Sequence, residues 1–370
     1  MQATILPFRF DVIGAGGPDA EIIREARQAR PIRHHRNEEN MTVRFGLLGA
    51  GRIGKVHAKA VTGNPDAVLV AVADAYPAAA DAIAKQYGCD VRSIEAIEAA
   101  KDIDAVVICT PTDTHADLIE RFSRAGKAIF CEKPIDLDVD RVKACMKVVD
   151  ETKGKLMVGF NRRFDPHFMA VRKAIDDGKI GDVEMVTITS RDPGAPPVDY
   201  IKRSGGIFRD MTIHDFDMAR FLLGEEVASV SATAAVLVDP DIGKAGDYDS
   251  VSVILQTKSG KQAIISNSRR ATYGYDQRIE VHGSKGVVSA ENQRPVSIEI
   301  ANGDGYTRPP LHDFFMTRYT EAYANEIAAF IAAIEQGATI SPSGADGLAA
   351  LALADAAVKS VQEKRQISVA

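Results

Sequence analysis

Short apolar runs alternate with helix-like segments through the first part of the chain. An apolar run at 43–48 precedes a helical pattern at 52–61, and this order repeats as far as residue 160. Runs without a polar face are typical of strands buried on both sides, so the alternation predicts a parallel sheet with helices on both faces. The expected strands are 43–48, 67–73, 105–109, 128–131 and 156–160, and the expected helices are 52–61, 77–87, 116–125 and 139–152.

After about residue 180 the pattern changes to longer strands in which apolar and polar residues alternate. This period of two predicts an antiparallel sheet with one face covered. Helical patterns at 317–336 and 345–363 close the chain. The expected strands of this second region are 183–190, 227–238, 251–257, 262–268 and 277–281.

Residues 1–40 differ from both regions. Five arginines and two histidines lie between Arg24 and Arg36, and apolar periodicity is weak. The segment lacks the apolar core of a secretory signal peptide, and Asp11, Asp19 and Glu21 make it acidic for a transit peptide. We expect a dispensable, disordered extension or an upstream misread start, with a functional arm as the alternative.

Composition and charge exclude several classes of protein. The 370 residues are 45% hydrophobic and carry a formal net charge of −6, which argues against a general binder of nucleic acid or of anionic membranes. No apolar run reaches the roughly 18 residues of a spanning helix. The four cysteines form no CxxC pair, so we expect no metal site, and their scarcity favours a reducing cytoplasm.

The strongest motif is Gly49-Ala50-Gly51-Arg52-Ile53-Gly54, between the first apolar run and the first helical pattern. In this context the glycines permit a tight turn, the approach of a pyrophosphate and close helix–strand packing, while the helix start offers amide donors. Asp74 ends the next strand about 20 residues later, where a carboxylate binds ribose hydroxyls. Because Ala75 and Tyr76 are not basic, NAD is expected over NADP. A simple turn role for Asp74 is the alternative.

Two other motifs follow expected strands of the parallel sheet, where such sheets bind ligands. Thr110, Pro111 and His115 belong to the sequence TPTDTH, and Glu132 and Lys133 to EKP. We predict that these five residues contact the cofactor. The alternatives are that Lys133 only reaches solvent and that His115 only starts a helix.

A third group lies in the sequence SGGIFRDMTIHDFDMARFLLG at 204–224. Asp210 and His214 are four residues apart, so on a helix they share one face. The carboxylate would then orient the imidazole and raise its basicity. In the alternative, Asp210 caps the helix and His214 packs.

Together, GAGRIG, TPTDTH, EKP and the D-x-x-x-H spacing resemble the glucose–fructose oxidoreductase/inositol dehydrogenase (Gfo/Idh/MocA) family over residues 41–365. GFNRRFDP, the 204–224 motif and YGYDQRIEVHG are most similar to its bacterial inositol 2-dehydrogenases. The resemblance implies an α/β protein with a Rossmann NAD-binding domain at 41–160. A substrate-binding and oligomerisation domain would follow at 161–370, with a large open, mainly antiparallel sheet and C-terminal helices that pack back on the first domain.

The resemblance also implies NAD-dependent oxidation of myo-inositol to 2-keto-myo-inositol in inositol catabolism. Lys133, Asp210 and His214 would be catalytic, in a homotetramer with a small polyol as substrate. Arg163, Asp192 and Tyr273 are further candidates for substrate contacts, together with Asp210 and His214, and Arg162 is the alternative to Arg163. Two other functions stay open, a family oxidoreductase for another inositol isomer or a free sugar and a non-catalytic nicotinamide sensor.

Overall fold

The computed structural model describes residues 42–369, so the predictions for residues 1–40 lie outside the described residues. The N-terminal part contains a six-stranded parallel sheet with strand order β3-β2-β1-β4-β5-β6. Of its central strands, β4 and β5 are fully buried and β1 is buried except at Arg44, as the apolar runs predict. The strands are β1 (Val43–Leu48), β2 (Ala67–Ala73), β3 (Asp90–Val91), β4 (Ala105–Ile108), β5 (Ala128–Cys131) and β6 (Leu156–Val158).

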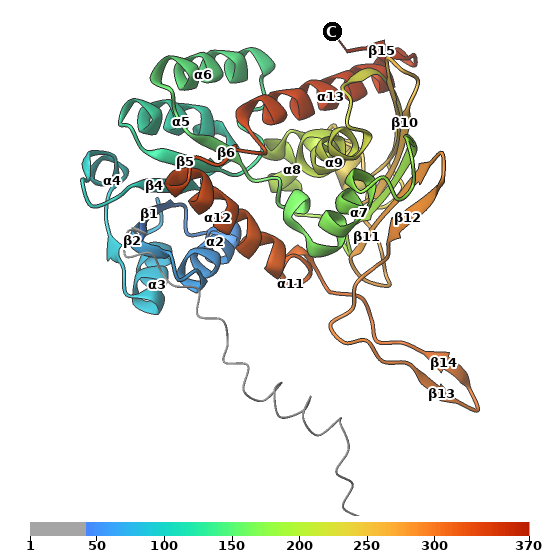
Figure 1. Ribbon diagram of the computed structural model, residues 1–370, viewed down its shortest axis with the longest axis horizontal. Coiled ribbons are helices and arrows are strands. Elements are labelled where there is room, and N and C mark those ends of the chain that lie inside the picture. Colours follow the sequence, from blue (N-terminus) through green and yellow to red (C-terminus); the bar gives the residue numbers. More distant parts are fainter. Residues whose placement is uncertain (1–41, 370) are drawn as a thin grey trace, which may run out of the picture. The chain divides into compact units, whose positions relative to one another are not determined.

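Helices connect these strands and cover both faces of the sheet (Figure 1). Each buries one apolar side; α5, for example, buries Leu118, Ile119 and Phe122. This arrangement confirms the predicted α/β fold with a Rossmann sheet. The helices are α2 (Arg52–Gly63), α3 (Pro77–Tyr87), α4 (Ile94–Ala99), α5 (His115–Arg124) and α6 (Val139–Thr152).

The C-terminal part contains a seven-stranded sheet with strand order β12-β11-β7-β10-β9-β8-β15. All its strand pairs are antiparallel except β7 with β10, so the predicted mainly antiparallel sheet is confirmed as a mixed one. The strands are β7 (Val183–Arg191), β8 (Val227–Ala235), β9 (Ser250–Thr257), β10 (Gln262–Ser268), β11 (Asp276–Gly283), β12 (Gly286–Ala290) and β15 (Ile367–Ser368).

The two faces of this sheet differ. Helices α9 (Ile213–Leu223) and α13 (Gly344–Glu363) pack on one face, so every second residue of β9 is buried. The other face leaves large apolar side chains at least a third exposed, namely Met185, Ile254, Ile264 and Val287. The sheet is therefore covered on one side only within the described residues.

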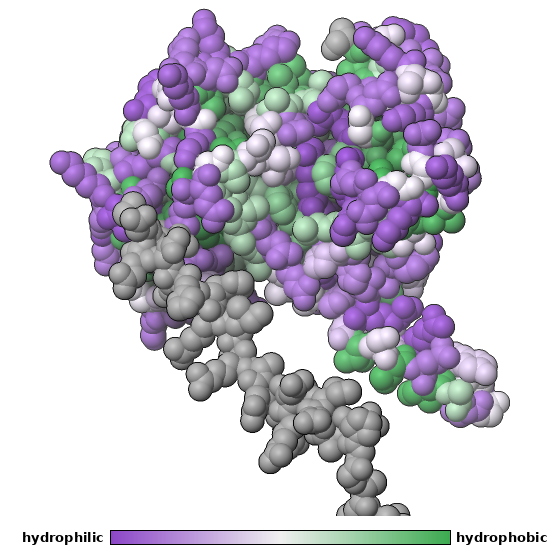
Figure 2. Space-filling model, viewed as in Figure 1, coloured by the Kyte–Doolittle hydropathy of each residue, from purple (hydrophilic) through white to green (hydrophobic). Residues whose placement is uncertain are grey.

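The remaining C-terminal elements include several that the sequence pattern did not predict. A hairpin of β13 (Ile300–Asn302) and β14 (Gly305–Thr307) extends away from the sheet as an arm with apolar side chains on its surface (Figures 1 and 2). The expected strand 227–238 ends at Ala235, shortly before Pro240. The helices not yet mentioned are α7 (Pro166–Asp176), α8 (Val198–Ser204), α10 (Pro240–Lys244), α11 (Phe315–Arg318) and α12 (Thr320–Glu335).

The last helices contact the N-terminal sheet region. Helix α12 packs against α2, and α13 contacts α6 and β6. The amide of Val158 also donates to the carbonyl of Pro342 at 3.0 Å. Because residues 42–370 form one compact unit, the domain boundary after residue 160 stays a prediction. Among the described helices, none is long and apolar enough to cross a membrane.

Candidate active site

The loop between β1 and α2 has the geometry of a dinucleotide site. Gly49 has a φ of 98°, and a Cβ there would lie 2.5 Å from the Cys109 carbonyl oxygen. A Cβ on Gly54 would lie 2.0 Å from the Gly49 oxygen, whereas one on Gly51 would meet no atom within 4 Å. The outer glycines are therefore required by packing, and Gly51 leaves open space beside the first turn of α2, which contains Arg52 and Ile53. Among the described residues no atom therefore blocks the approach of a pyrophosphate to the backbone at Gly51.

Asp74 lies beside this loop at the end of β2. Its carboxylate accepts hydrogen bonds from the amides of Ala50 at 2.6 Å and Tyr76 at 2.7 Å. It therefore has the turn role given above as the alternative. Each carboxylate oxygen can accept a second hydrogen bond, so the ribose role stays a prediction that this geometry allows.

Glu132 follows β5, but its carboxylate is held inside the protein. Glu132 Oε1 lies 2.6 Å from Nε2 of the fully buried His57 on α2. A Cβ on Gly159 would approach the same carboxylate to 3.2 Å, so Gly159 gives it room. Glu132 thus links α2 to the strand ends, a role that the sequence did not indicate, and its predicted cofactor contact stays untested.

His115 starts α5 and joins the two loops at the strand ends. Its Nδ1 lies 2.8 Å from the Pro134 carbonyl oxygen, and its Nε2 lies 2.8 Å from the Thr110 carbonyl oxygen. Thr110 is tied to the start of the helix by a 2.7 Å hydrogen bond between its hydroxyl and that of Thr114. Pro111 precedes the short turn Thr112–Thr114.

Lys133 and Asp210 come from the two different sheet regions and meet here. The ammonium nitrogen of Lys133 donates to the backbone carbonyl of Asp210 at 2.7 Å and lies 3.7 Å from its carboxylate. Burial lowers the pKa of His214 well below its usual value, and the positive charges of Lys133 and Arg162 lower it further. The structure therefore brings the three predicted catalytic residues into one neighbourhood.

The expected hydrogen bond between Asp210 and His214 is absent among the described residues, and this part of the prediction is wrong. Residues Phe208–Thr212 form a turn of π-helix before α9 begins at Ile213. Asp210 therefore lies in the π turn and His214 in the α-helix that follows it. His214 Nδ1 is buried without a hydrogen-bond partner among the described residues.

Asp210 is held instead by two side chains that the sequence did not single out. The Tyr200 hydroxyl on α8 donates to Asp210 Oδ1 at 2.8 Å. Arg269, which is 1% exposed, donates to Asp210 Oδ2 at 3.3 Å and lies 3.9 Å from Asp247. Arg269 is 59 residues from Asp210 and Tyr200 is 10 residues from it on another helix, so the spacing within one helix could not identify either partner.

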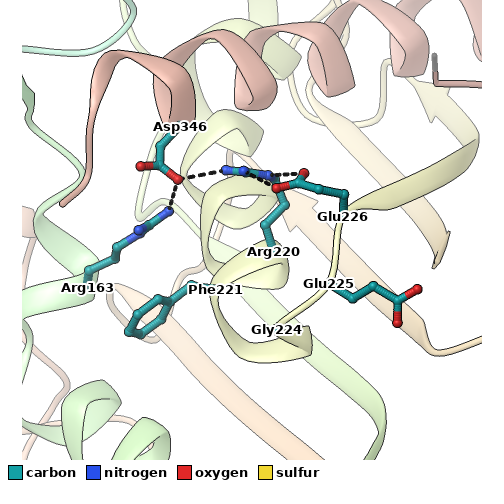
Figure 3. A pocket seen from close by; sticks show the side chains of 7 residues that line it. All are labelled: Arg163, Arg220, Phe221, Gly224, Glu225, Glu226 and Asp346. Atoms are coloured by element: carbon teal, nitrogen blue, oxygen red, sulfur yellow. Dashed lines mark hydrogen bonds and ion pairs between the residues drawn. The ribbon is translucent and has the colours of Figure 1, made fainter. Parts of the chain in front are cut away.

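The two adjacent arginines have different partners, and the predicted substrate contact of Arg163 stays a prediction. Arg163 donates to Asp217 at 2.6 and 2.8 Å and to Asp346 at 3.0 Å. Figure 3 shows it in a surface pocket of about 300 Å³, where Arg220 also donates to Asp346. The guanidinium is therefore held by two carboxylates, those of Asp217 and Asp346.

Arg162 lies near His214, as its effect on the histidine's pKa shows. Its guanidinium is paired with the fully buried Asp215 and donates to Ser190 at 2.9 Å. Asn267 donates to the other oxygen of Asp215 at 2.8 Å. Arg162 therefore belongs to a buried network under the site, which includes the unpredicted Asp215.

Asp192 and Tyr273 are in different environments. Burial raises the pKa of Asp192 to about 7, and the neighbouring charges of Arg269 and Asp210 act on it as well. Asp192 therefore lies close to the catalytic group. Tyr273 is 49% exposed, and its hydroxyl donates to Asp276 at 2.5 Å. Neither the burial of Asp192 nor the hydrogen bond of Tyr273 tests the predicted binding of substrate.

Comparison with known proteins agrees with this geometry. Residues 43–160 match the model of the oxidoreductase family with an NAD-binding Rossmann fold, and residues 168–289 match the GFO/IDH/MocA C-terminal domain. The chain belongs to the Gfo/Idh/MocA family of oxidoreductases. Its cofactor is NAD, which confirms the prediction from the glycine loop.

Three individual relatives each match 89% of this chain. It is 87% identical over 330 residues to the inositol 2-dehydrogenase of Rhizobium meliloti, covering 89% of this chain and all of that one. The myo-inositol dehydrogenase structure from Corynebacterium glutamicum is 44% identical with a TM-score of 0.86, covering 89% and 99%. A scyllo-inositol dehydrogenase from Lactobacillus casei with bound NAD(H) and scyllo-inositol is 31% identical with a TM-score of 0.83, again covering 89% and 99%.

Proposed function

We propose that this protein catalyses the NAD-dependent oxidation of myo-inositol to 2-keto-myo-inositol, as a step of inositol catabolism. The observation that carries the proposal is the convergence of Lys133, Asp210 and His214 at the carboxyl edge of the NAD-binding sheet. The names of the relatives at 87% and 44% identity support inositol as the substrate.

The side chains have distinct parts in this reaction. NAD supplies the acceptor for the hydride that leaves the alcohol carbon. His214 takes the hydroxyl proton, and because burial and two nearby cations lower its pKa, the ring is neutral and ready to accept it at neutral pH. Lys133 donates to the reacting oxygen and stabilises the negative charge that develops there. Asp210 holds Lys133 through its backbone carbonyl.

A substrate panel tests this proposal directly. NAD reduction is followed with myo-, scyllo- and chiro-inositol, glucose and xylose, and the product is identified by mass spectrometry. We expect the highest kcat/KM with myo-inositol and a lower kcat/KM with NADP than with NAD. A higher kcat/KM with glucose, or no turnover of any inositol, would contradict the proposal.

Scyllo-inositol is the second candidate substrate. The relative with bound scyllo-inositol has the same fold over 89% of this chain, and the two isomers differ only in the orientation of one hydroxyl. A higher kcat/KM for scyllo-inositol than for myo-inositol in the same panel would favour this alternative.

We also propose that the protein is a homotetramer in a reducing cytoplasm. The open face of the seven-stranded sheet, with Met185, Ile254, Ile264 and Val287, offers apolar surface for a second copy. All four cysteines are free thiols. Light scattering on the full chain at micromolar concentration should give four times the mass of one chain, and a monomer would contradict this part.

A further inference from the structure

His115 lies between two carbonyl oxygens that belong to the two loops at the carboxyl ends of β4 and β5. Both ring nitrogens are 2.8 Å from a carbonyl oxygen, Nδ1 from that of Pro134 and Nε2 from that of Thr110. A neutral imidazole carries one N–H and one lone pair, so it can donate to only one of them. Burial of the ring, which is 2% exposed, lowers the pKa of His115 and favours the neutral form, although the two carbonyl contacts act in the opposite direction.

The surroundings decide which carbonyl receives the proton. The contact with Pro134 is buried, whereas the contact with Thr110 is only partly buried. A buried acceptor without a donor is costly, while a partly exposed one can be satisfied by water. The loop that follows Thr110 is also held by Thr114, through its hydroxyl and its amide, whereas His115 is the one hydrogen-bond partner of the Pro134 carbonyl in the described part of the chain.

We propose that His115 is a positioning residue whose Nδ1–H donates to the Pro134 carbonyl and thereby fixes the ammonium group of Lys133 in the active site. Pro134 directly follows Lys133, whose ammonium nitrogen donates to the Asp210 carbonyl. A shift of this peptide would move the donor away from the reacting oxygen. The inference rests on the proposed function, since it gives His115 its effect through Lys133.

Two amide substitutions separate the two hydrogen bonds. In His115→Asn the side-chain nitrogen takes the place of Nδ1 and can still donate to Pro134. In His115→Gln it takes the place of Nε2 and reaches only Thr110. We expect His115→Gln to lower kcat by about 10- to 100-fold more than His115→Asn does, because a misplacement of about 1 Å has effects of this size.

Each outcome has a defined meaning. Retained kcat in His115→Gln, or an equal loss in both variants at wild-type melting temperature, would overturn the proposal. If either variant has a lowered melting temperature, the proposal is tested instead by the protonation of His115 in the wild-type protein. The ¹⁵N spectra of histidine-labelled enzyme distinguish protonated from unprotonated ring nitrogens. A proton on Nδ1 alone supports the proposal, and a proton on Nε2 alone or on both nitrogens overturns it. This measurement needs no turnover, so it stands apart from the substrate panel, in which the proposed function itself would fail.

Discussion

The glycine loop at 49–54 and the turn at 208–214 serve the same proposed reaction, but different kinds of groups form the site in each of them. In the loop the backbone and an open space beside Gly51 form the site. In the turn buried charges form it, since Asp210 is held by Lys133, Tyr200 and Arg269. A substitution in the loop should therefore act through a steric clash, whereas a substitution at the turn should act through the charge and position of neighbouring groups.

The largest effect is expected in the loop. Gly54→Ala places a Cβ 2.0 Å from the Gly49 carbonyl oxygen, and neither backbone can move aside without opening the loop. We expect no measurable NAD reduction and a lower melting temperature. Gly63→Ala, at the end of the same helix and with open space around it, is the control and should keep full activity. An active Gly54→Ala enzyme would contradict the steric account of the loop.

The next largest effect concerns the base at the turn. We expect His214→Ala to lower kcat by about 10²- to 10⁴-fold, the usual contribution of a general base, with little change in the KM for NAD. Kinetics normalised to folded protein, together with melting curves, measure this. His167→Ala removes an exposed histidine from α7 and should leave kcat unchanged. A folded His214→Ala enzyme with most of its kcat would end the catalytic assignment.

These two regions also differ in how far the sequence could predict them. The glycine loop depends on spacing within a few residues, and its position between a strand and a helix was enough to predict a dinucleotide site. The turn depends on contacts over long sequence distances. Arg163 meets Asp217 across 54 residues and Arg162 meets Asp215 across 53, so no local pattern shows which arginine points toward the site.

The local conformation of the turn added a second difficulty. The spacing of Asp210 and His214 predicted that the carboxylate orients the imidazole, but His214 Nδ1 has no hydrogen-bond partner among the described residues. Asp210 lies in a π-helical turn at 208–212, which the sequence pattern did not predict. The residue types of the catalytic group could therefore be predicted from the sequence, while their mutual orientation could not.

The pH dependence of turnover tests the coupling of charges at the turn. His214 accepts a proton only when neutral, and burial and the charges of Lys133 and Arg162 lower its pKa. The wild-type kcat should therefore be constant through neutral pH and should fall only when the pH drops below the ordinary histidine pKa of about 6.5.

Removing one of these cations should shift the acid limb of the pH profile, which is the pH range in which turnover falls as His214 becomes protonated. In Lys133→Met, the lost positive charge raises the pKa of His214, so the limb should shift to higher pH in addition to the loss of kcat. Lys143→Met, which removes an exposed lysine on α6, should leave the limb in place. An identical limb in Lys133→Met and wild type would show that the two groups are not coupled.

The smallest effect is expected at Asp192. Burial raises its pKa to about 7, so its carboxyl group changes from neutral to ionised across the neutral range. The ionised form accepts hydrogen bonds from two polyol hydroxyls more strongly than the neutral form. The KM for inositol should therefore fall about 3-fold between about pH 6 and about pH 8, which corresponds to about 0.7 kcal/mol, within the range of one hydrogen bond.

Asp192→Asn cannot ionise, so its KM should be independent of pH and close to the wild-type value at the acid end. If the wild-type KM shows no such change, or if Asp192→Asn keeps it, Asp192 does not bind the substrate and its raised pKa only reflects burial beside Asp210.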